Sequence, residues 1–179
     1  MEILITPLII IIVAAVWWII KSNDFNRKAI KADEGLSGVE VALTKRYDML
    51  TKLLDVTKGY AEHEKALFSQ VTELRRGMSF EELNRAIGET DAMAGRLIAV
   101  AEAYPELRSA EVFRELQSGI RDAEEHLQAA RRLYNTNVSA FNSAVVVFPA
   151  SLVAKAKSMG KREFFVAEEN KREDLSMKF

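Results

Sequence analysis

The stretch ILITPLIIIIVAAVWWII, residues 3–20, decides how this 179-residue chain is organised. It contains no charged side chain, and only Thr6 and Pro7 interrupt its apolar character. As a helix it would be about 27 Å long, close to the ~30 Å hydrocarbon core of a bilayer. Pro7 falls near the start of such a helix, where it does little damage. The stretch predicts a transmembrane anchor over residues 1–21, with the lipid bilayer as its partner through residues 3–20.

The flanks of this stretch favour a retained anchor over a cleaved signal peptide or a buried soluble helix. A signal peptide needs a basic region before its apolar run, and Met1 and Glu2 provide none. The run ends in Trp17 and Trp18 followed by Lys21, as at a membrane–water interface. We therefore expect a single-pass membrane protein.

Basic residues lie on one side of the predicted anchor only. None precedes it, whereas Lys21, Arg27, Lys28 and Lys31 follow it closely. Because cytoplasmic flanks are enriched in lysine and arginine, this asymmetry predicts an N-terminus outside and the remaining chain in the cytoplasm.

The composition excludes several classes of function. With 25 basic and 26 acidic residues the net charge is −1, so no nucleic-acid partner is predicted. The chain has no cysteine, which excludes disulfides, thiolate metal sites and thiol catalysis. No glycine-rich phosphate loop and no Ser/His/Asp set stands out. We predict no catalytic, cofactor-binding or metal-binding residue, and we do not expect an enzyme.

Beyond the anchor, apolar residues recur at helical spacing. Leu36, Leu43 and Leu50 lie seven residues apart, which predicts a first long helix from about residue 22 to 76. Residues 22–38 would form a membrane-proximal stalk continuous with this helix, and a kink would fall at Gly35 and Gly38.

A second and a third helix follow. Ser79 and Glu82 have the spacing of a capping box, and Tyr104 precedes a proline, so the second helix is expected between them. The third helix carries an apolar column with a period of seven and a neighbouring column of small residues, which favours close antiparallel packing. The apolar column consists of Phe113, Ile120, Leu127, Tyr134, Phe141 and Phe148.

These patterns predict an all-α fold in which the anchor is followed by an antiparallel bundle of three long helices and a short fourth near residues 150–159. The bundle would cover residues 39–160, and a charged C-terminal tail would cover residues 161–179. If successive helices alternate in direction, the basic segment from Lys155 to Arg162 lies at the end of the bundle far from the membrane.

Several ordered motifs resemble those of the bacterial LemA family. They are VTKGYAEHE at 56–64, AYPEL at 103–107, FRELQ at 113–117 and ARRLYN at 130–135, then Phe141-Asn142, Phe148-Pro149 and Phe164-Phe165. The resemblance implies a single-pass protein of the bacterial inner membrane with a cytoplasmic four-helix bundle. It implies no enzymatic activity.

Polar residues inside the predicted columns are the candidates for an interaction or for setting helix register. Arg46 should point inward, either as a ligand-binding charge or paired with a carboxylate such as Glu124, unless its head group reaches water. His63 and Glu64 could join His126 in a metal site only if the first and third helices align, and a partly exposed helix surface is the better interpretation. The full set comprises Arg46, Tyr60, His63, Arg131, Arg132, Tyr134, Asn135 and Asn137.

Two functions compete. The first is a membrane-anchored, non-enzymatic scaffold, self-associating as a homo-oligomer, that presents its bundle to an unidentified membrane or cytoplasmic protein. The second is a small-ligand binder or enzyme that uses polar groups inside the bundle, which a cavity lined by Arg46, Glu64 and Asn137 would favour. Membrane remodelling by the basic segment is a third alternative. Phe68 and Met93 are expected to lie outside the main columns and to offer a second surface.

Overall fold

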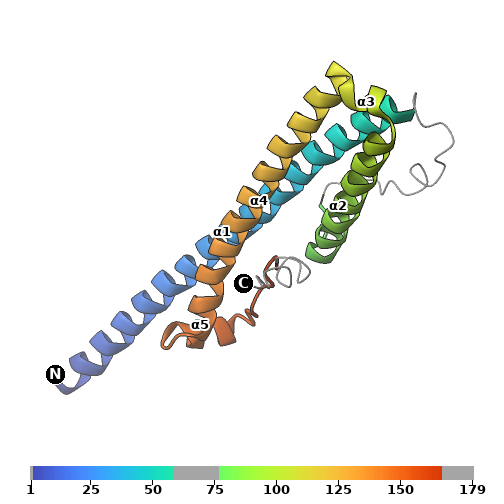
Figure 1. Ribbon diagram of the computed structural model, residues 1–179. Helices are drawn as coiled ribbons and strands as arrows, with labels where there is room; N and C mark the ends of the chain where they lie inside the picture. Colours follow the sequence, from blue (N-terminus) through green and yellow to red (C-terminus); the bar gives the residue numbers. More distant parts are fainter. Residues whose placement is uncertain (1, 59–76, 167–179) are drawn as a thin grey trace, which may run out of the picture. The chain divides into compact units, whose positions relative to one another are not determined.

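The computed structural model describes residues 2–58 and 77–166 (Figure 1). In this part of the chain there are five helices and no strand, so the all-α prediction is confirmed. The helices are α1 (Glu2–Lys58), α2 (Phe80–Ala103), α3 (Pro105–Ser109), α4 (Glu111–Val146) and α5 (Ala150–Ala156). Packing divides the chain into two compact units. We call Met1–Ala32 with Asn135–Phe179 the anchor unit, and Asp33–Tyr134 the Arg46 unit.

Helix α1 joins the apolar stretch and the expected stalk in one element of 57 residues. It continues through Gly35 and Gly38 without a break at the expected kink. Among the described residues, α1 is the one unbroken helix that is long and apolar enough to span a membrane. None of its most apolar segment, near the N-terminus, is buried. The expected continuation of this helix to residue 76 lies outside the described residues.

Helix α2 begins and ends where the local sequence signals predicted. The Ser79 hydroxyl accepts a hydrogen bond from the Glu82 backbone N–H at 3.2 Å, and the Glu82 carboxylate accepts one from the Ser79 N–H at 2.8 Å. This reciprocal pair satisfies two backbone donors that the first turn leaves without partners. At the other end, Tyr104 leaves the helical conformation before Pro105, and the short α3 follows.

Within the Arg46 unit, α2 runs in the same direction as α1, and α4 runs against both (Figure 1). The start of α2 lies beside Glu40, whose carboxylate accepts a hydrogen bond from the Gly77 N–H at 2.9 Å. The end of α2 packs beside Leu53. The expected alternation of helix direction is therefore wrong for α1 and α2, since Gly77, just before α2, lies beside Glu40 and not beside the end of α1.

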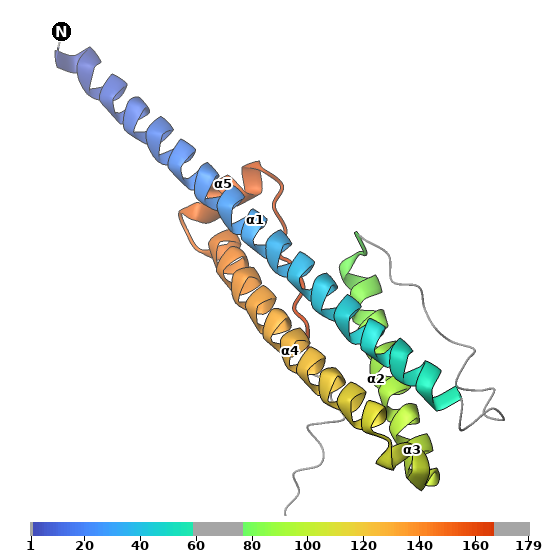
Figure 2. The same ribbon diagram turned by 90° about the horizontal axis from the view of Figure 1, so that it is seen from above.

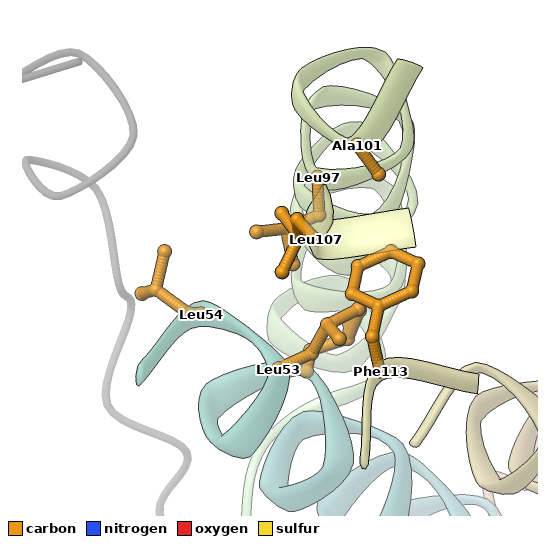
Figure 3. Close-up of a cluster of buried hydrophobic side chains, with 7 residues drawn as sticks. Leu53, Leu54, Leu97, Ala101, Leu107 and Phe113 are labelled. Atoms are coloured by element: carbon orange, nitrogen blue, oxygen red, sulfur yellow. The ribbon is translucent and has the colours of Figure 1, made fainter. Parts of the chain in front are cut away.

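The apolar core of the Arg46 unit gathers where α1, α2, α3 and α4 meet (Figure 3). Its buried members are Leu50, Leu53, Leu54, Leu97, Ala101, Leu107 and Phe113. Met93 packs against this cluster, which corrects its expected place on a second exposed surface. Phe68 lies outside the described residues.

The apolar column of α4 is buried over most of its length. Phe113, Leu127, Tyr134 and Phe141 are all less than 5% exposed. Phe148, however, is 76% exposed, which corrects its expected place in the core. The reason is that α4 ends at Val146, so the seven-residue period no longer aims the next side chain inward.

In the anchor unit, the end of α4 and α5 pack against α1 (Figure 2). The buried cluster consists of Phe25, Phe141, Val153 and Ala154, and Trp17 packs partly against it. The rings of Phe25 and Phe141 meet edge to face with centroids 6.3 Å apart, a favourable geometry for aromatic pairs. The core thus reaches back to the end of the apolar stretch.

Candidate functional site

Arg46 lies at the centre of a buried polar network in the Arg46 unit. Its side chain is 5% exposed, and each of its three guanidinium nitrogens faces an oxygen of another helix. Nη1 donates to Thr90 Oγ1 at 3.1 Å, Nη2 lies 2.5 Å from Asp91 Oδ1, and Nε lies 3.0 Å from Glu124 Oε2. The predicted pair between Arg46 and Glu124 is therefore confirmed.

The network uses the charge of Arg46 internally. Asp91 and Glu124 bring two carboxylates to one guanidinium, and Thr90 donates its own hydroxyl hydrogen to the Ile87 carbonyl at 2.8 Å. The Nε–Oε2 contact is an ion pair without hydrogen-bond alignment, since neither atom makes a hydrogen bond. The arrangement fixes α1, α2 and α4 at one level, as buried polar groups do when they set register. The positive charge of Arg46 is therefore directed at Asp91 and Glu124 of the same chain.

An open groove runs along α4 next to this network. Its volume is about 710 Å³, and charged groups of both signs line it. They include Lys45, Asp122, Glu124, Glu125, His126 and Arg132. Arg132 thus lies on an open surface of mixed charge, and its neighbour Arg131 is half-buried. Tyr134 instead belongs to the core, where its ring stacks on Phe80 with centroids 5.9 Å apart.

The asparagines of α4 act in the anchor unit. Asn137 Nδ2 donates to the Lys31 carbonyl at 2.8 Å, which ties α4 to α1. Asn135 Nδ2 donates to the Phe165 carbonyl at 2.8 Å, while Asn135 Oδ1 accepts from the Phe165 N–H at 2.9 Å. Arg46 and Asn137 fall in different units, and Glu64 lies outside the described residues, so a cavity lined by these three side chains stays a prediction.

A second asparagine repeats the pairing of Asn135 one heptad later. Asn142 exchanges two hydrogen bonds, of 2.9 and 2.8 Å, with the backbone of Arg162. Seven residues of helix and three residues of extended chain both cover about 10 Å, so the two asparagines match the rise of the extended segment. Residues 160–166, which we call the strap, therefore lie along α4 with Phe165 buried. The expected tail from residue 161 is held in place as far as residue 166.

No pattern in the sequence predicted the strap. The available signal was the spacing of Asn135 and Asn142 ahead of two phenylalanines, but that spacing names no partner by itself. Tyr60 and His63 lie outside the described residues, and His126 is exposed on the open groove. Within the described ranges no three His, Asp or Glu side chains come together as a metal site.

The chain is similar in sequence to a known family of proteins over most of its length. The profile of the LemA family matches residues 35–179. Protein LemA of Metamycoplasma hominis is 24% identical over 160 residues, which cover 87% of this chain and 73% of the relative. Magnetosome protein MamQ of Magnetospirillum gryphiswaldense is 22% identical over 72% of this chain and 58% of its own length.

Proposed function

Because this chain belongs to the LemA family, we propose that it is a membrane-anchored, non-enzymatic scaffold that presents its helices to a protein partner. The observation that carries the proposal is the continuity of α1 from the exposed apolar stretch into the Arg46 network. The apolar stretch and the Arg46 network are thus joined by helix and not by an unstructured linker. The charge of Arg46 is paired with Asp91 and Glu124 of the same chain. This pairing favours a protein that presents a surface over one that binds a small ligand.

We place the bulk of the chain in the cytoplasm at the bacterial inner membrane. Lys21, Arg27, Lys28 and Lys31 support this orientation through the positive-inside rule. Since the chain has no cysteine, a single substitution gives one labelling site. Ser139→Cys, on the exposed face of α4, should react with a membrane-impermeant maleimide only after cells are permeabilised. Labelling in intact cells would reverse the topology.

Self-association in the membrane would give the scaffold several copies of its binding surface and raise its avidity. Ala14 and Ala15 lie in the exposed apolar part of α1, where small side chains allow neighbouring helices to approach closely. Light scattering of the detergent-solubilised full-length chain should give a mass of more than one subunit. Ala14→Leu should reduce this mass, and Val13→Leu is the matched control. A single-subunit mass across several mild detergents would contradict the proposal.

The protein partner can be sought by crosslinking in intact membranes, followed by purification of the full-length chain. The expected result is a heteromeric product that depends on the anchor. Recovery of the same product with a soluble variant lacking residues 1–20 would show that membrane presentation is not required.

A further inference from the structure

The turn between α4 and α5 lies beside the end of the predicted membrane span. Val153 and Ala154 of α5 pack on Phe25 and Phe141, and Trp17 packs partly against the same cluster. Trp17 belongs to the last turn of the apolar stretch. Helix α5 is therefore attached to α1 at the place where α1 would leave the bilayer.

The register of α4 against α1 sets the level of the turn. Asn137 contacts Lys31, and Phe141 contacts Phe25, so α4 runs back along α1 towards its N-terminus. Because both helices rise by about 1.5 Å per residue, the two advance past each other roughly residue for residue. Val146, five residues beyond Phe141, then lies near the level of Ile20, where the apolar stretch ends. In both views the turn projects towards the N-terminal end of α1 (Figures 1 and 2).

The turn and the outer side of α5 expose large apolar side chains next to one another. Val147 is 58% exposed, and Val146, Phe148 and Leu152 are exposed to a similar or greater degree. Helix α5 is bent by 92° from α4. Since α4 runs antiparallel to α1 here, a spanning α1 would place α5 along the membrane plane, as in an interfacial helix.

The charged residues around this surface are predominantly basic. Residues 135–162 contain no Asp or Glu but include Lys155, Lys157, Lys161 and Arg162. Over residues 2–32 and 135–166 there are eight basic and three acidic groups, whereas residues 33–134 contain fourteen basic and nineteen acidic groups. The near-neutral total conceals a basic anchor unit. Of the three acidic groups in residues 2–32 and 135–166, Asp24 is paired with Lys28.

We propose that residues 146–161 form a second membrane contact, which seats on anionic lipid beside the transmembrane helix. Val147, Phe148 and Leu152 enter the boundary between headgroups and acyl chains, and Lys155, Lys157 and Lys161 contact anionic headgroups. Apolar side chains next to a basic cluster are the composition that such surfaces favour. A second copy of the chain would bring a second basic surface to the same place, so its charge opposes that occupant.

The contact makes the end of α4 part of the membrane attachment. A second contact with the bilayer, next to the Phe25 cluster, limits the tilt of the anchor unit against the membrane. The proposal rests on the anchoring by α1 proposed above, and the experiment includes a probe that tests the anchoring separately.

The test uses full-length single-cysteine variants labelled with an environment-sensitive fluorophore and reconstituted into vesicles. Val147→Cys and Leu152→Cys report on the contact, Val13→Cys reports on the anchor, and Ser139→Cys is an exposed control two turns back along α4. In phosphatidylcholine vesicles containing phosphatidylglycerol, probes at 147 and 152 should emit at shorter wavelength and be quenched by spin-labelled lipid. The probe at 139 should not.

Charge dependence distinguishes a lipid contact from other occupants. Replacing Lys155, Lys157 and Lys161 by glutamine should remove most of the lipid quenching at 147 and leave it unchanged at 13, with an expected loss in surface affinity of about fivefold per lysine. Quenching at 13 without quenching at 147 would overturn this inference alone, while its absence at 13 would overturn the anchoring. A blue-shifted probe at 147 that resists lipid quenching, and shifts with protein concentration in detergent, would assign the surface to a second copy.

Discussion

At the scale of single residues, Arg46 is a buried cation whose charge must be balanced by neighbouring groups. It is buried, and its charge is balanced by Asp91 and Glu124, each of which is about one-third exposed. Removing the cation would leave two neighbouring carboxylates without their counterion. Water can reach these carboxylates, so part of that cost is relieved.

We expect Arg46→Met to lower the free energy of unfolding by about 3 kcal/mol, near the low end for breaking a buried ion pair. Urea unfolding of the detergent-solubilised full-length chain, followed by far-ultraviolet circular dichroism, measures this. Lys45→Met removes an exposed charge from the adjacent position and should have little effect. Equal stability of the two variants would show that the network contributes nothing.

Phe141 is a buried residue in the apolar cluster of the anchor unit. It is 3% exposed, it contacts the Phe25 ring, and the Arg162 guanidinium lies 5.1 Å from its ring centroid. Phe141→Ala should lower the free energy of unfolding by about 3–5 kcal/mol, the range for truncating a buried phenylalanine. The exposed neighbour Ala140→Gly is a control for helix propensity alone, with an expected cost of about 1 kcal/mol. An unchanged melting temperature for Phe141→Ala would contradict its assignment to the core.

At the scale of elements, the start of α2 depends on Ser79 and two glutamates. Ser79 caps the helix through Glu82, and the pKa of Glu81 is lowered by its own backbone N–H first and by a hydrogen bond from Ser79 second. A lowered carboxyl pKa adds stability that is complete above the ordinary value of 4.5 and is lost as the pH falls through the lowered value.

Ser79→Ala should therefore lower stability by about 1 kcal/mol at neutral pH through loss of the cap. The difference from wild type should shrink as the pH falls below 4.5, because the substitution also removes one cause of the lowered Glu81 pKa. Paired thermal unfolding at several pH values measures both effects, and Ser118→Ala on an exposed position of α4 is the control. A pH-independent difference would exclude the part assigned to Glu81.

The attachment of the strap to α4 can be tested in the same way. Asn142→Ala removes both hydrogen bonds to the Arg162 backbone, so the strap should detach from α4 more often. Since Lys161 and Arg162 are trypsin sites within it, cleavage there should become faster than in wild type, as followed by mass spectrometry. Ser143→Ala, at the exposed neighbouring position, should leave the rate unchanged. Equal rates for Asn142→Ala and wild type would show that this pairing does not hold the strap.

At the scale of the whole molecule, the apolar stretch meets the buried core of the anchor unit at Trp17. Deleting residues 1–20 removes the exposed apolar surface but also the packing of Trp17 against the Phe25 cluster. The truncated chain should be soluble and helical, with the Arg46 unit intact and the anchor unit less stable. Circular dichroism and proteolysis of the truncated chain test this, and a largely unfolded product would contradict it.

The sequence by itself determined the features that depend on near neighbours. The length of an uncharged apolar run predicts the span of residues 3–20, and the spacing of Ser79 and Glu82 predicts where α2 starts. The seven-residue period identifies the buried face of α4 as far as Phe141, and the same period on the first helix places Arg46 on the inward face with Leu53. Each of these follows from hydrogen bonds or burial within a few turns of one helix.

The tertiary structure alone decided the direction of α2, the exposure of Phe148, the seat of the strap and the return of α5 to the end of the apolar stretch. These features depend on where the chain reverses and on contacts between residues as far apart as Asn26 and Lys157, which share a hydrogen bond. Helical periodicity specifies which face of a helix is buried, but the same face can pack against a parallel or an antiparallel neighbour. Only the packed chain distinguishes the two.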